Sequence, residues 1–136
     1  MPLAVFRLPG KTWSVCFSKE HGWGYETEIG PAWLVNKPSV IPFLPLLEMT
    51  WPAAQVKVGE AASACEIADK FPFEAVVLTA LDWETQYWPS LAVEWLEQGF
   101  PVSTASLPKL LALASNKVVP QKVRHRAAAL ARHAAQ

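Results

Sequence analysis

Prolines divide an apolar segment, residues 31–52, and limit the structures that it can form. Large apolar side chains lie between these prolines: Trp33, Ile41, Phe43, Leu44, Leu46, Leu47, Met49 and Trp51. Proline lacks a backbone N–H group, so it interrupts both a continuous helix and a central strand. Together with Lys37 and Glu48, the prolines also exclude a membrane-spanning helix, which needs about 20 largely apolar residues. We therefore expect residues 31–58 to form an apolar crossover that is covered by the rest of the chain or by another protein.

The residues before this segment favour β-structure. Polar and apolar residues alternate over residues 12–18 and 24–29, and residues 3–8 have a similar composition. Such alternation of β-branched and aromatic residues with polar ones is typical of strands. The glycines that follow His21 favour a turn between the two strands. Residues 1–30 are therefore predicted to form a small β-hairpin or meander.

From residue 59 onward the spacing of the apolar residues is helical. It predicts helices over residues 60–71, 73–81, 82–98, 107–115 and 121–135, although residues 73–81 also fit a buried strand. Asp82 is the expected N-cap of the third helix, which Pro89 either kinks or divides. Gly99 favours an end to that helix, and Ser103 or Ser106 caps the next one.

These patterns predict one domain with an α+β fold that is mainly α. In this fold a small N-terminal hairpin or meander and the Pro-rich crossover are followed by an antiparallel stack of four to five helices. A chain of 136 residues, 51% hydrophobic and 18% charged, is long and apolar enough for a packed core. The sequence VVPQKVRHRAAAL, residues 118–130, resembles the inner helix of HEAT-type repeats, an architectural similarity that covers residues 83–135. No period of 30 to 50 residues repeats along the sequence, as a repeat array requires.

The chain contains seven tryptophans, which is a large number for its length. They fit either an aromatic core or a binding surface, because tryptophan is enriched at the centres of protein interfaces. The leading hypothesis is a non-enzymatic protein-binding module that binds another protein, as a regulator, inhibitor or complex subunit, or binds itself as a homodimer. Its predicted contact residues are Trp33, Phe43, Leu44, Leu46, Trp51, Trp23 and Trp88.

Charge sums to zero but is uneven along the sequence. Residues 1–97 have a net charge of −6, and residues 98–136 have a net charge of +6. The alternative hypothesis is therefore a nucleic-acid-associated protein that uses the basic side chains of the last helix, Lys122, Arg124, Arg126 and Arg132. Pairing with acidic residues of the same chain is the competing explanation, and we favour it because the acidic part opposes the approach of phosphates.

A third hypothesis is a small enzyme that depends on cysteine and histidine. Cys16 and His21 lie close together in sequence, across the proposed hairpin loop. The strand alternation predicts that Cys16 faces solvent, whereas the helical pattern predicts that Cys65 is buried. A nucleophilic thiol needs such exposure and a neighbouring base.

The sequence offers little support for a metal or a cofactor. His125 and His133 are eight residues apart, about 12 Å along a helix, whereas zinc lies roughly 2 Å from each nitrogen ligand. We expect no cofactor, no metal and no membrane association. Two cysteines and the lack of a recognisable signal peptide favour free thiols in the cytoplasm.

Overall fold

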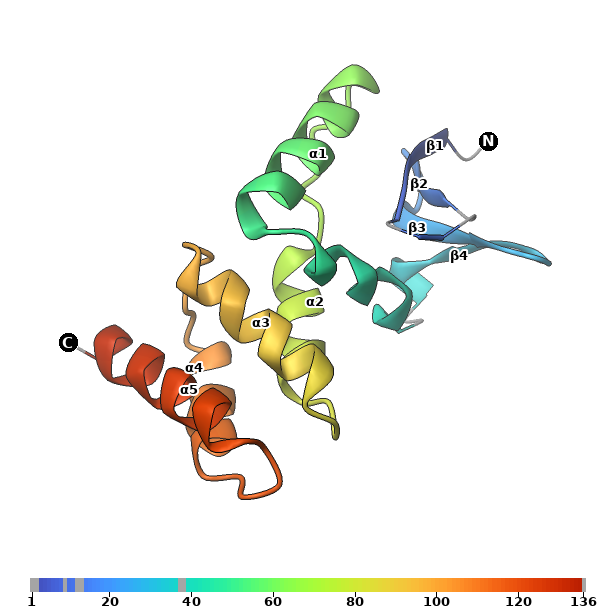
Figure 1. Ribbon diagram of the computed structural model, residues 1–136. Helices are drawn as coiled ribbons and strands as arrows, with labels where there is room; N and C mark the ends of the chain where they lie inside the picture. The colour runs from blue at the N-terminus through green and yellow to red at the C-terminus, as the bar shows by residue number, and fades with distance from the viewer. Residues whose placement is uncertain (1–2, 9, 12–13, 37–38, 136) are drawn as a thin grey trace. The chain divides into compact units, whose positions relative to one another are not determined.

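The computed structural model describes residues 3–8, 10–11, 14–36 and 39–135 (Figure 1). It confirms an α+β fold that is mainly α, with 53% of the described residues in helices and 16% in strands. The chain divides into two compact units, Met1–Pro72 and Phe73–Gln136. The boundary lies after residue 59, where the helical part was expected to begin, because the first long helix belongs to the same unit as the sheet. That the whole chain is one domain stays a prediction.

The first unit begins with a four-stranded antiparallel sheet in the order β1-β2-β3-β4. Its strands are β1 (Leu3–Arg7), β2 (Ser14–Ser18), β3 (Gly22–Thr27) and β4 (Gly30–Trp33). The first three confirm the predicted meander, although residues 12 and 13 of the second predicted strand lie outside the described residues. The sequence pattern does not predict β4, because Pro31 suggests the crossover. At the edge of a sheet a proline is tolerated, since its missing N–H group has no neighbouring strand to bond.

Aromatic side chains form the core of the first unit. The ring centroid of Phe71 lies 5.7 Å from that of Phe6, 5.2 Å from that of Trp23 and 5.2 Å from that of Phe43. Tyr25 lies edge-on to Phe43 at 5.6 Å. Tilted and edge-to-face rings at these distances are favourable packing arrangements. The side chain of Phe71, far along the chain, thus joins the sheet to the crossover.

The Pro-rich crossover contains helical turns that its prolines were expected to prevent. A single 3-10 turn, η1, spans Leu34–Asn36, and a longer 3-10 helix, η2, spans Ile41–Glu48. Pro42 lies in the first turn of η2 and Pro45 lies inside it. Both fit because the fixed φ of proline, near −65°, lies in the 3-10 range.

The first long helix, α1, spans Trp51–Ala64, so the predicted helix over residues 60–71 was placed too late in the sequence. Thr50 caps α1, since its Oγ1 accepts a hydrogen bond from the Ala53 N–H at 3.3 Å. Pro52 occupies the first turn, where the N–H group that it lacks would have no helical partner. A hydroxyl residue followed by a proline is a helix start signal, but here it lies inside the apolar segment.

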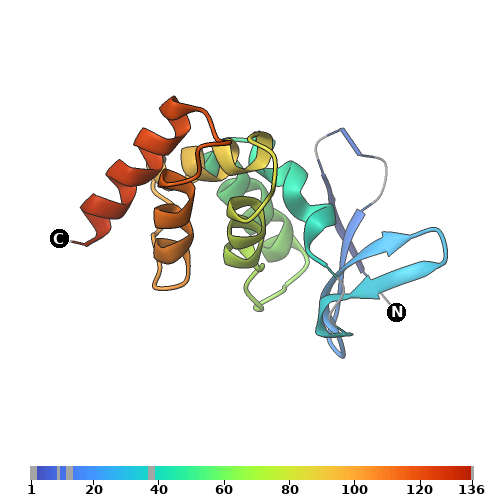
Figure 2. The same ribbon diagram turned by 90° about the horizontal axis from the view of Figure 1, so that it is seen from below.

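The second unit consists of four helices that form two stacked hairpins (Figure 2). They are α2 (Phe73–Leu81), α3 (Tyr87–Glu97), α4 (Ser106–Ala114) and α5 (Gln121–Ala134). α2 packs on α3 and α4 packs on α5, while α2 contacts α4 and α3 contacts α5. α4 begins 33 residues after α2, and α5 begins 34 residues after α3. The structure therefore contains a helical repeat that the sequence itself does not show as a period.

Two local predictions in this unit need correction or refinement. Asp82 does not cap α3; it follows α2, and its carboxylate binds the Lys109 ammonium at 2.5 Å. Pro89 lies in the first turn of α3, so it begins a new helix and does not kink a longer one. Trp95 of α3 is buried, as expected, and its ring contacts that of Phe73 at 6.0 Å. In the described ranges, none of the helices has the length and apolar character needed to cross a membrane.

Candidate functional site

Four of the seven predicted contact residues are buried. Phe43, Leu44 and Leu46 expose at most 1% of their surface, and Trp23 exposes 6%. The expectation that they form an exposed strip is therefore wrong. A 3-10 helix distributes successive side chains around its axis, and the interior of the protein surrounds η2 so completely that every side chain from residue 43 to residue 47 is buried.

The other three predicted contact residues, Trp33, Trp51 and Trp88, are half-buried. Trp33 stacks on the His21 ring at 5.0 Å with an interplanar angle of 12°, and Trp88 lies edge-on to Tyr87 at 4.8 Å. Their role in protein binding stays a prediction. Trp13 lies outside the described residues.

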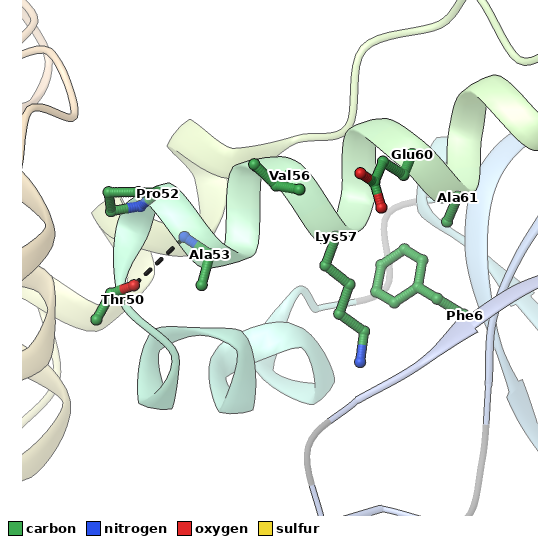
Figure 3. A pocket seen from close by; sticks show the side chains of 8 residues that line it. All are labelled: Phe6, Thr50, Pro52, Ala53, Val56, Lys57, Glu60 and Ala61. Carbon is green, nitrogen blue, oxygen red and sulfur yellow. Dashed lines mark hydrogen bonds between the residues drawn. The ribbon is translucent and has the colours of Figure 1, made fainter.

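An open hollow follows one side of α1, and it is the first candidate for a binding surface (Figure 3). It is lined by side chains from β1, from the cap of α1 and from α1 itself: Phe6, Thr50, Pro52, Ala53, Val56, Lys57, Glu60 and Ala61. Only Ala54 and Val58 of the 14 residues of α1 are buried, whereas Val56 is 56% exposed. The lining is mainly apolar, and Lys57 and Glu60 contribute one charge of each sign. We call this feature the α1 groove.

The sequence pattern does not predict the α1 groove, because residues 53–58 were assigned to the crossover. The signal that marks it is the pair Thr50 and Pro52, which places the beginning of a helix at residue 51. The residues of the groove then recur at intervals of three and four and so share one side of that helix. Exposure of this side is a property of the packing, and periodicity alone does not determine it.

A second hollow, of about 670 Å³, lies beside the β2–β3 turn and the segment that follows α1. Its lining brings Lys19 and His21 together with Trp33, Cys65 and Asp69, which are distant in sequence. Cys65 is half-buried here, not enclosed in a helical core as predicted. The thiol that solvent reaches is therefore the one expected to be inaccessible.

Cys16 has the opposite environment from the one predicted, since it is fully buried. It lies directly opposite Ala4 and Gly24 in the middle of the sheet, and its neighbours Val15 and Phe17 are buried as well. Burial, and secondarily the negative charge of Glu26, raise the pKa of the Cys16 thiol to about 11. At neutral pH this group is a protonated thiol, so Cys16 does not supply the nucleophile of the proposed cysteine–histidine pair.

The basic side chains of α5 do not form one unoccupied cationic face. Arg126 binds Glu97 of α3, with Nε 3.1 Å from each carboxylate oxygen and Nη2 2.5 Å from Oε1. Arg124 donates from Nε to the Val119 carbonyl at 3.1 Å. Lys122 and Arg132 are exposed. The four residues of the nucleic-acid hypothesis are thus divided between internal contacts and solvent.

The charge asymmetry along the sequence also disappears when it is counted by compact unit. Residues 1–72 contain six basic and seven acidic side chains, a net charge of −1, and residues 73–136 contain six basic and five acidic ones, a net charge of +1. The acidic residues between positions 74 and 97 share a unit with the basic residues that follow them. Neither unit has the strong positive field that favours phosphate binding.

Metal coordination finds no candidate in the described ranges, where no group of three or more His, Cys, Asp or Glu side chains is placed to hold an ion. The α1 groove and the hollow beside Cys65 are therefore the features from which a function can be argued. No family model matches the sequence, and comparison with curated proteins and with solved structures gave no match.

Proposed function

We propose that the protein is a non-enzymatic protein-binding module and that the α1 groove is its binding surface. The observation that carries this proposal is that α1 buries two of its 14 residues while it exposes apolar surface along the groove. Short helices in proteins are stabilised mainly by packing of an apolar face, because isolated ones are marginal in water. A helix of 14 residues with so little buried surface gains stability when a partner covers its exposed side.

The chemistry of the groove supports binding and not catalysis. Its lining consists of alkyl, aromatic and small side chains with Lys57 and Glu60 between them. The one hydroxyl, that of Thr50, is engaged as the cap of α1. An apolar surface interrupted by a few charges that fix orientation is typical of sites that recognise a protein partner.

The proposal places the binding surface on the helix after the Pro-rich segment and not on the segment itself. Phe43, Leu44 and Leu46 then act as the buried support of the first unit. Both cysteines are free, and we propose a reducing compartment, the cytoplasm, as the place of action.

The test uses the full chain with a photo-crosslinking amino acid at one of two positions, in cells. Position 56 lies in the α1 groove, and position 29 is the matched control, because Ile29 is a fully exposed aliphatic residue of the same unit. We expect protein cross-links at position 56 that are missing at position 29 and that Ala53→Arg removes. Equal cross-linking at the two positions, or none at position 56, would overturn the proposal.

A further inference from the structure

We infer that the partner of the α1 groove is a second copy of this chain, bound through the same side of α1 in antiparallel orientation; this inference rests on the proposed function. The side in question consists of Ala53, Val56, Lys57, Glu60, Ala61 and Ala64. These positions follow one another at intervals of three and four residues, so they lie along one side of the helix. Four of them are exposed and two are half-buried.

The pattern on this side is complementary to itself. When two copies of α1 cross about a two-fold axis between residues 58 and 59, Lys57 lies opposite the partner's Glu60. The same operation places Val56 opposite the partner's Ala61, and Ala53 opposite the partner's Ala64. Each pair occurs twice, because a two-fold interface uses the same patch on both subunits. All the pairs are compatible: two opposite charges, two apolar side chains, and two small side chains that let the helices approach closely.

The charges determine which arrangement of the two helices is favoured. Within the described part of the chain, no ion pair joins Lys57 or Glu60 to another residue, so both charges remain available to a partner. A parallel pair in register would place like charges together, whereas the antiparallel pair makes two contacts of opposite sign. Exposed ion pairs contribute about 0.2–1 kcal/mol each, so these contacts set orientation and register more than affinity.

The length of α1 limits the strength of such a dimer. A helix of 14 residues is about 21 Å long. Contact along one such helix falls at or below the roughly 1,200 Å² of a standard stable interface. The dimer is therefore weak and reversible, and it forms at a chain concentration on the order of 100 μM.

The experiment is sedimentation equilibrium of the full chain over a range of concentrations, with circular dichroism as a check on folding. The variants are Lys57→Glu, Glu60→Lys and the exchange of both charges. We expect each single variant to weaken dimerisation about tenfold or more, because it creates two like-charge contacts in the dimer. The double exchange restores opposite charges across the axis, and it should restore dimerisation. Lys70→Glu, an exposed charge reversal elsewhere in the first unit, is the matched control and should have no effect.

Three results would overturn the inference: a monomer at every concentration, a dimer that the single reversals leave unchanged, or a double exchange that fails to restore association. The photo-crosslinking test separates these failures from failure of the proposed function. Cross-links from position 56 to other proteins, in a chain that remains monomeric, would keep the binding module and refute self-association. No cross-links and no dimer would refute both.

Discussion

The guanidinium of Arg126 on α5 binds the carboxylate of Glu97 at the end of α3. In the same way, Lys109 on α4 binds Asp82, which follows α2. Each helix of the second hairpin is thus joined by an ion pair to the end of the corresponding helix in the first hairpin. These two pairs show how basic and acidic residues that are separated along the sequence combine in one nearly neutral helical unit.

Removal of the Arg126–Glu97 pair should lower the stability of the protein by a small, measurable amount. Both side chains are partly exposed, 25% and 38%, so we expect Arg126→Ala to reduce the free energy of unfolding by about 0.5–1 kcal/mol. Urea unfolding of Arg126→Ala, Glu97→Ala and the double variant measures the coupling between them. The double variant should cost less than the two single ones together, and high salt should reduce the difference. Lys122→Ala is the control, and strict additivity would contradict a functional ion pair.

Two helices end in the same hydrogen-bonded motif but with different residues at its left-handed position. At the end of α1, Glu66 has a φ of 56°, and the Ile67 N–H donates to the Ala62 carbonyl at 2.9 Å. At the end of α3 the corresponding residue is Gly99, with a φ of 114°. Glycine adopts this conformation readily, whereas a residue with a Cβ atom is strained there by about 1 kcal/mol.

Exchanging residue types at these two positions should shift stability in opposite directions. We expect Glu66→Gly to raise the free energy of unfolding by about 0.5 kcal/mol or more, because relief of strain exceeds the entropy gained by the unfolded chain. Gly99→Ala should lower it by about 1 kcal/mol or more. Chemical unfolding of both variants checks this, with an unchanged dependence on denaturant as the sign that only stability changed. Shifts of the same sign would contradict the assigned conformations.

Cys65 should react with a thiol reagent much faster than Cys16 in the native protein. Cys65 is half-buried, whereas Cys16 has no exposed surface and a pKa raised to about 11. The thiolate is the reacting form, so both burial and protonation protect Cys16. Labelling for increasing times followed by mass spectrometry of peptides measures the two rates. In denaturant the rates should become similar, and fast native labelling of Cys16 would show that its strand is not covered.

The outcome for Cys16 shows what strand periodicity does and does not predict. Alternation correctly assigns the strand and states which residues share a face, but it contains no information on whether another part of the chain covers that face. Helix ends were predicted well where the signal is local, as at Gly99 and at Pro120, which precedes α5. The beginning of α1 was missed because its cap, Thr50, lies among prolines that indicate an extended chain. The α1 groove was missed with it, since its residues share a side only once the helix is placed.

A methyl group added at Gly24 should be far more harmful than one added at Gly59. A Cβ atom at Gly24 would collide with the Ala32 backbone and with the Trp33 ring, which lies against the glycine. We expect Gly24→Ala to lower the free energy of unfolding by about 2 kcal/mol or more, because β3 and β4 must move apart. Gly59 lies in α1 with open space around it, so Gly59→Ala should raise stability by up to about 1 kcal/mol. Thermal unfolding of the two variants measures this contrast, and a tolerated Gly24→Ala would refute the close approach of Trp33.

The buried Cys16 thiol should also make stability depend on pH in the alkaline range. Its pKa rises from 9.0 to about 11 in the folded protein, so the native state keeps this proton over a range in which the unfolded state loses it. The unfolded state then binds fewer protons, and the free energy of unfolding falls as pH rises from about 9 to about 11. Two pKa units correspond to a loss of up to about 2–3 kcal/mol, all of it retained below pH 9.

Comparison with Cys16→Ala isolates this effect, because the lysines and tyrosines titrate in both proteins. The variant should be less stable at neutral pH by an amount that does not depend on pH, which reflects its smaller side chain. Between pH 9 and 11 the stability of the wild-type protein should fall more steeply, so that the difference between the two proteins narrows or reverses. Urea unfolding at fixed pH values measures both curves. Parallel curves up to pH 11 would show that Cys16 ionises equally in both states, and therefore that water reaches the middle of the sheet.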